Sequence, residues 1–108
     1  MRPLAFGYFR LRAADPPDVG ERFTAEMQGY AEREGLTLAE VYNDPFEPPA
    51  GVSDRSAFCA LVDALRRDDT TAVIIPAPEH LSRRSGGYTE RRTIIETEAG
   101  ARLLVIRG

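Results

Sequence analysis

Four short apolar segments alternate with three segments of helical periodicity, and this alternation restricts the fold more than any other feature of the chain. The apolar segments are residues 4–11, 36–42, 72–75 and 103–106. Short apolar runs bounded by proline, glycine or charged residues are typical of buried strands. Strands that alternate with helices favour a parallel sheet, because parallel neighbours need a crossover connection. The order predicts one α/β domain over residues 1–108, a three-layer structure in which a four-stranded, mainly parallel sheet has helices on both faces.

The three helical segments are predicted from the spacing of their apolar side chains. The first begins at Val19, places Phe23 and Met27 on one face, and ends at Gly35. The second is predicted to be capped by Ser53 or Asp54 and to bury one face, which comprises Ala57, Phe58, Leu61, Val62 and Leu65. The third is predicted over residues 88–99, with residues 85–87 before it as a flexible joint. The proline-rich residues 43–51 are predicted to form a loop.

The charge composition limits the kinds of ligand that the chain can take. The formal net charge is -3, and all 14 residues of the lysine and arginine total are arginines. A net negative charge argues against a general polyanion binder, since nonspecific nucleic-acid affinity comes mainly from cations that neutralise phosphates. Arginine, however, suits bidentate contacts to phosphate or carboxylate groups. Any anion site is therefore expected to be local.

Several classes of protein are not expected for this composition. Cys59 and His80 are the only residues of their types, so neither a disulfide within the chain nor a zinc site is expected. No glycine-rich phosphate loop follows the first apolar segment, so a nucleotide cofactor is not expected. The chain shows neither a signal peptide nor a transmembrane segment. We therefore expect a cytoplasmic protein without metal, cofactor or membrane contact.

The candidate site lies where the first and third strands of the predicted sheet end. Ligands of open parallel sheets bind beyond the carboxyl ends of the strands, near the point where the strand order reverses. This placement predicts an anion-binding group that consists of Arg10, Arg12, Arg55, His80 and Arg83. In the alternative interpretation the arginines form structural ion pairs with Glu79, Asp44 and Asp54. His80 is then a solvated loop residue.

These segments resemble the N-terminal catalytic domain of the serine recombinase (resolvase/invertase) family. Tyr8-Phe9-Arg10-Leu11-Arg12 is similar to the family's opening Tyr-x-Arg-Val-Ser, and Glu79-His80-Leu81-Ser82-Arg83 is similar to its Asp-Arg-Leu-Ser-Arg. Residues 40–44 resemble its second strand with the following aspartate, and residues 55–58 resemble its Arg-x-x-Phe helix start. The order and spacing hold from about residue 4 to residue 106. The resemblance implies the fold predicted above and a phosphate cradle that includes Arg10, Arg55 and Arg83.

The chain departs from the family pattern where that pattern carries the chemistry. The family's nucleophilic serine corresponds to Arg12, which is not a nucleophile, and the first serine of the chain is Ser53. The family's Asp-Arg pair has become Glu79-His80, and histidine cannot make the fork of hydrogen bonds that arginine makes. The long dimer helix and the DNA-binding segment of the family are not expected after Gly108. The resemblance therefore implies a protein that does not cut or rejoin DNA.

Three classes of function remain open at this point. The first is a catalytically inactive regulatory or binding module that contacts a protein partner, DNA or another phosphate through the arginine-lined edge. The second is a phosphoester-processing enzyme with altered chemistry, in which Glu79 and His80 act on water. The third is a structural domain that associates, as a homodimer for example, through its last strand and buries Leu104 and Ile106. The missing nucleophile and the negative net charge favour the first.

Overall fold

A computed structural model describes residues 2–47, 55–68 and 70–108 of the chain. The elements are β1 (Leu4–Leu11), α1 (Val19–Arg33), β2 (Thr37–Pro45), α2 (Ser56–Arg67), β3 (Ala72–Ile75), a 3-10 turn (Pro78–His80), α3 (Ser85–Thr93), a π-helical turn (Ile94–Glu98) and β4 (Arg102–Val105). The four strands form one sheet in the order β2-β1-β3-β4, and every neighbouring pair is parallel. This confirms the predicted α/β class, and β1 and β3, at whose ends the candidate site was predicted, are neighbours.

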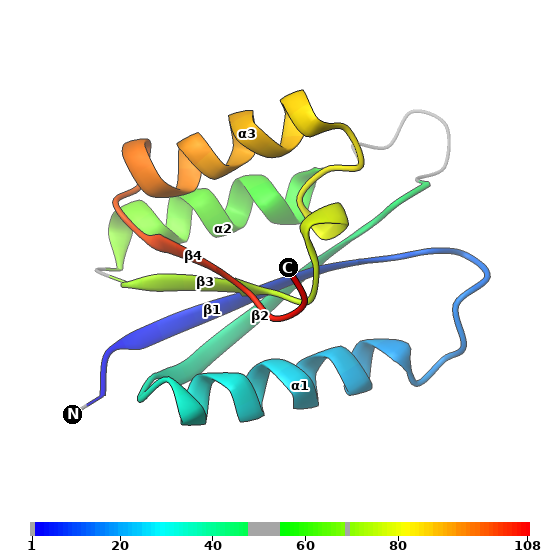
Figure 1. Cartoon of the computed structure of the whole chain (residues 1–108), viewed down its shortest axis with the longest axis horizontal. Coiled ribbons are helices and arrows are strands. Elements are labelled where there is room, and N and C mark those ends of the chain that lie inside the picture. The colour runs from blue at the N-terminus through cyan, green and yellow to red at the C-terminus, as the bar shows by residue number, and fades with distance from the viewer. Residues whose placement is uncertain (1, 48–54, 69) are drawn as a thin grey trace.

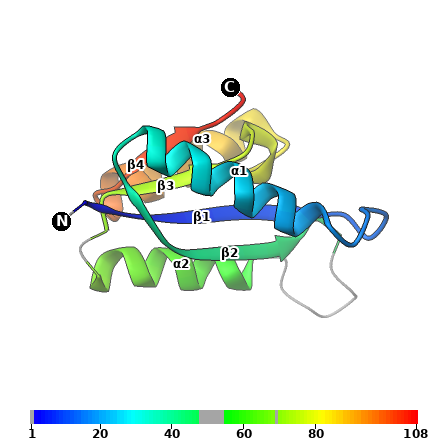
Figure 2. The ribbon, with the colours of Figure 1, turned by 90° about the horizontal axis from the view of Figure 1, so that it is seen from below.

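The helices cover the sheet from both sides, α1 on one face and α2 with α3 on the other (Figure 1). Figure 2 looks onto the α1 side, where β2 lies beside the helix. The side chains of each strand alternate between the two faces, so the core has two halves. Met27 and Ile74 belong to the half under α1, whereas Tyr8, Leu61 and Ile75 belong to the half under α2 and α3. All five side chains are buried.

Two predicted boundaries are wrong. β2 extends through Asn43 and Asp44 to Pro45, whereas this part was predicted to be loop, because β1 pairs with it as far as Leu11. Proline is tolerated there because β2 lies at the edge of the sheet, where one side of the backbone needs no partner strand. α3 begins at Ser85, so the glycines predicted to form a flexible joint lie in its first turn.

The start of α2 is held by a residue from outside the helix. The predicted caps Ser53 and Asp54 lie outside the described residues. The Asp44 carboxylate of β2 accepts hydrogen bonds from the backbone N–H groups of Ala57 (2.8 Å) and Phe58 (2.9 Å). A carboxylate at a helix start satisfies free amide groups and interacts favourably with the helix dipole. β2 thereby fixes where α2 begins.

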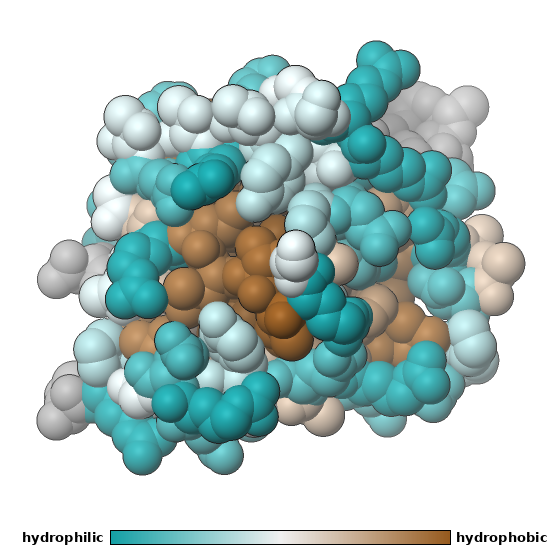
Figure 3. Space-filling view, viewed as in Figure 1, coloured by the Kyte–Doolittle hydropathy of each residue, from teal (hydrophilic) through white to brown (hydrophobic). Residues whose placement is uncertain are grey.

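β4 lies at the edge opposite to β2. Its side chains from Leu103 to Val105, and Ile106 after it, are partly buried and pack on both halves of the core. The apolar surface at the centre of Figure 3 lies over this strand. None of the helices in the described part of the chain is long and apolar enough to cross a membrane.

Candidate functional site

The carboxyl end of β1 meets the 3-10 turn through His80. The backbone N–H of Arg10 donates a hydrogen bond to Nδ1 of His80 at 2.9 Å. Both residues are buried, with 5% of Arg10 and 4% of His80 exposed. Because Nδ1 accepts this bond, the ring is neutral and carries its proton on Nε2. The bond joins residues 70 positions apart and fixes the turn to the end of the central strand.

The surroundings of His80 keep the imidazole neutral. The ring of Phe23 from α1 packs edge-on against it at 5.0 Å between centroids, and the Phe46 ring lies at 5.7 Å. Burial is the main cause that lowers the pKa of His80 from 6.5 to about 4, and the guanidinium groups of Arg107, Arg12 and Arg10 lower it further, against the opposite effect of Glu79. Since His80 is buried, it is not the solvated loop residue of the alternative interpretation. The neighbouring Leu81 is fully buried and carries the turn inward.

Phe46 is the centre of the arginine group. The guanidinium carbons of Arg10, Arg12 and Arg83 lie 4.6, 5.0 and 4.5 Å from the centroid of its ring. A cation at this distance from an aromatic face is attracted by the negative charge of that face. Arg10 also donates to the backbone carbonyls of Pro45 (3.1 Å) and Phe46 (3.4 Å). Three guanidinium groups thus lie around one half-buried aromatic ring at the carboxyl edge of the sheet.

Arg12 and Arg83 form the accessible part of this group, since both are exposed. An Arg12 guanidinium nitrogen lies 3.4 Å from the Glu79 carboxylate, and both side chains of this pair are about half exposed, 47% and 49%. An exposed ion pair of this kind contributes little to stability and opens at small cost. This pair is of the kind that the alternative interpretation expected for some of the arginines. Because the ion pair is exposed, the Arg12 guanidinium remains accessible to a ligand from solvent.

Asp44 has a structural role that the sequence did not reveal. It is 2% exposed, and besides the two α2 amides it accepts a hydrogen bond from the Tyr8 hydroxyl at 2.7 Å. Burial and this hydrogen bond raise the pKa of Tyr8 above its ordinary value, and the charges of Arg55 and Arg10 act in the opposite direction. Arg55 immediately precedes α2, 5.8 Å from the Phe58 ring centroid. The structure thus places Arg55 towards α2, on the Tyr8 side, while Arg10, Arg12, His80 and Arg83 surround Phe46.

The geometry bears on the predicted hydrolytic alternative. The Nδ1 atom of His80 is occupied by the Arg10 amide, and the ring lies in an apolar setting between two phenylalanines. Glu79 points to Arg12 and is exposed. No group of three or more histidine, cysteine, aspartate or glutamate side chains in the described part of the chain is placed to hold a metal ion. Nδ1 of His80 is therefore not available to activate a water molecule in this arrangement.

Three solved structures share this fold with the chain. The C-terminal catalytic domain of ISC1926 TnpA, an IS607-like serine recombinase, has a TM-score of 0.78 and 21% identity, over 97% of this chain and 68% of that one. The N-terminal catalytic domain of TP901-1 integrase has a TM-score of 0.75 and 16% identity, over 95% and 76%. A resolvase family site-specific recombinase from Streptococcus pneumoniae has a TM-score of 0.76 and 14% identity, over 97% and 72%.

These likenesses bear out the resemblance at the level of the fold, which is that of serine recombinase catalytic domains. No protein-family model matches the sequence, and no curated protein matches it either. At this level of identity the shared property is the architecture. What the edge of the sheet does in this chain has to be argued from its own residues.

Proposed function

We propose that this chain is a catalytically inactive, recombinase-like binding module that holds a phosphate group of DNA or of another ligand at the carboxyl edge of its sheet. The observation that carries this proposal is the convergence of Arg10, Arg12 and Arg83 on the ring of Phe46. Guanidinium groups bind phosphate oxygens through paired, charge-assisted hydrogen bonds. Arg12 and Arg83, which are exposed, contact the phosphate. Arg10 and His80, which are buried, hold the edge of the sheet in place.

The absence of catalysis in this proposal depends on position 12. Arg12 stands where the resemblance places the attacking serine, and its guanidinium lies against Glu79 and Phe46. A guanidinium can hold a phosphate but cannot attack it. The proposal therefore combines a retained anion site with a missing nucleophile.

We expect Arg12→Ala and Arg83→Ala each to weaken binding of a fluorescently labelled DNA oligonucleotide by about tenfold at low ionic strength, which corresponds to one lost charge-assisted contact. Fluorescence anisotropy measures the affinity, and inorganic phosphate added as a competitor reports whether a phosphate alone is held. Arg102→Ala, on β4, is the matched control and should bind like the parent protein. Equal affinities for all three variants would overturn the anion site.

A second assay separates binding from catalysis. The protein is incubated with nicked DNA and examined on denaturing gels for a covalent protein–DNA adduct or for strand-transfer products. We expect neither. Products that disappear in an Arg10→Ala variant would show that the edge performs chemistry without a serine at position 12.

A second candidate function is association of two copies through β4. It is supported by the position of β4 at the sheet edge and by the apolar surface over it (Figure 3). We expect a dimer by light scattering, converted to monomer by Leu104→Arg but not by Ala60→Arg on the exposed side of α2. Urea unfolding checks that both variants remain folded. A parent protein that stays monomeric at its highest soluble concentration would rule this candidate out.

A further inference from the structure

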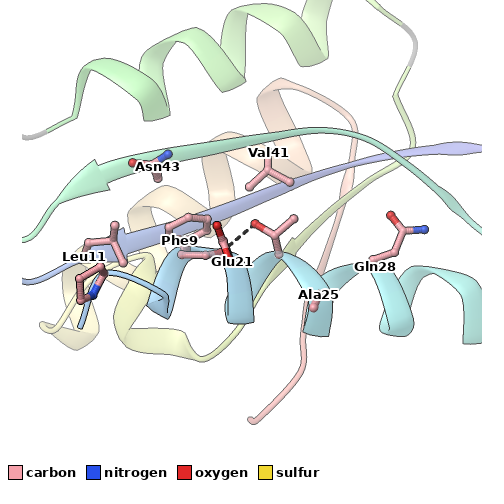
Figure 4. Close-up of a pocket in the computed structure, with 10 residues that line it drawn as sticks. Phe9, Leu11, Glu21, Ala25, Gln28, Val41 and Asn43 are labelled. Carbon is pink, nitrogen blue, oxygen red and sulfur yellow. Dashed lines mark hydrogen bonds between the residues drawn. The ribbon is translucent and has the colours of Figure 1, made fainter. Parts of the chain in front are cut away.

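A groove of about 760 Å³ runs between α1 and β2, on the face of the sheet that α1 covers. Its floor is apolar and consists of Phe9, Leu11 and Val41, with Glu21 and Asn43 among the polar residues along its rim (Figure 4). Met27 and Ala31 of α1 pack into the half of the core under this helix, which contacts β1, β2 and β3. A different side of α1, which carries Glu21, Thr24 and Gln28, borders the groove and faces Val41 and Asn43 of β2 across it.

β2 supplies a second feature along the same groove, since it is an edge strand of nine residues. The backbone N–H of Phe46 donates to the carbonyl of Leu11 on β1. Backbone groups of successive residues alternate between the two sides of a parallel strand. Val41 and Asn43 therefore direct their N–H and C=O groups away from β1, and these are the β2 residues that line the groove. The edge can take a further strand whose side chains reach the groove floor.

The charged residues along the rim determine which kind of added strand the groove favours. Along α1 the rim carries Glu21, and at its far end the Glu32 carboxylate lies 3.2 Å from Gln28, which lines the groove. Arginine, lysine and histidine do not line the groove in the described part of the chain. None of the arginines around Phe46 lines the groove, although Leu11 at its floor lies between Arg10 and Arg12 in the chain. Glu21 is thus the one charged side chain that lines the groove in the described part of the chain, Glu32 lies beside the lining residue Gln28, and the floor is apolar.

We propose that this groove binds an extended segment of a partner protein, which adds to β2 as a fifth strand. The segment places apolar side chains over Phe9, Leu11 and Val41 and basic side chains beside Glu21 and Glu32. Main-chain hydrogen bonds to Val41 and Asn43 supply affinity, and the groove with its carboxylates supplies the choice of sequence. This interaction is independent of the phosphate proposal.

The test uses isotope-labelled protein and two synthetic peptides of equal length. Both alternate valine and threonine, one with lysines and the other with glutamates near its ends. NMR titration should show saturable shifts at residues of β2 and α1 with the basic peptide. Slower hydrogen exchange of the Val41 and Asn43 amides should accompany them. We expect the acidic peptide to bind the parent protein about tenfold more weakly than the basic peptide does. The Glu21→Arg variant should likewise bind the basic peptide about tenfold more weakly than the parent protein does.

Two tryptophan variants provide the matched comparison. Ala25→Trp fills the groove from the exposed side of α1 and should abolish binding, whereas Ala60→Trp, on the exposed side of α2, should bind normally. Circular dichroism checks the fold of both. Shifts confined to β4, binding unaffected by Ala25→Trp, or concentration-dependent shifts at Val41 without peptide would each overturn the proposal. The last result would identify a second copy of the chain as the occupant.

Discussion

Replacement of Asp44 by alanine is expected to lower the free energy of unfolding by about 3 kcal/mol, because it removes one buried acceptor from three donors. The donors are the Tyr8 hydroxyl and the amides of Ala57 and Phe58, at 2.7 to 2.9 Å. A buried donor that loses its partner costs more than the bond itself contributed, since it is also removed from water. Urea unfolding followed by circular dichroism measures the change.

Two further variants test how much of this loss of stability comes from the Tyr8 hydrogen bond and whether it is specific to Asp44. Tyr8→Phe removes only the hydroxyl and should cost about 1 kcal/mol, because Asp44 keeps both amide donors. Asp68→Ala, an exposed aspartate just after α2, is the control and should change the free energy by less than about 0.5 kcal/mol. If Asp44→Ala proved no more destabilising than Asp68→Ala, Asp44 would not be what holds the start of α2.

The stability of the protein is expected to fall as the pH is lowered from about 6.5 to about 4, because of His80. Burial, with the nearby guanidinium groups, lowers the pKa of His80 from 6.5 in the unfolded chain to about 4 in the folded protein. Between these values the unfolded chain binds a proton that the folded protein excludes, so protons favour unfolding. The contribution is complete above pH 6.5 and is lost as the pH falls to 4. The expected loss is at most about 3 kcal/mol.

The comparison that isolates His80 is His80→Asn, whose side-chain oxygen can accept the Arg10 amide bond but does not titrate. Urea midpoints are measured for both proteins from neutral pH down to pH 4. Below pH 6.5, the free energy of unfolding of the parent should fall more steeply with decreasing pH than that of the variant. Above pH 6.5, the two curves should be parallel, separated by a constant difference. Curves that stay parallel below pH 6.5 would show that His80 titrates alike in both states.

The alternation of strands and helices could be predicted because it rests on local patterns. The apolar run from Ala72 to Ile75 and the helix from Val19 to Arg33 fall where their spacing predicts. Glycine disfavours a helix interior, so Gly86 and Gly87 suggested a joint rather than the first turn of α3. The turn before α3 is set partly by a hydrogen bond from the Arg84 amide to Ser82 Oγ, which helix periodicity does not report.

The candidate site was predictable only in part, because its contacts cross between distant segments. The sequence places Arg10, Arg12 and Arg83 at one edge once β1 and β3 are neighbours. It does not place Phe46 among them, since that depends on the register in which β2 pairs with β1 as far as Pro45. The role of Asp44 was missed for the same reason. A polar residue at the end of an edge strand next to a helix start is the pattern that could have indicated it.

The position of β1 in the sheet has a consequence for synthesis on the ribosome. β1 precedes the other strands in the chain, yet it lies between β2 and β3, and Gly7 pairs with both Val41 and Ile74. Phe6, Tyr8 and Phe9 are buried in the folded protein, and their strand lacks its β3 partner until residues 72–75 have emerged. Contacts between distant segments also slow folding. The central strand therefore completes its native pairing only after residues 72–75 have been synthesised.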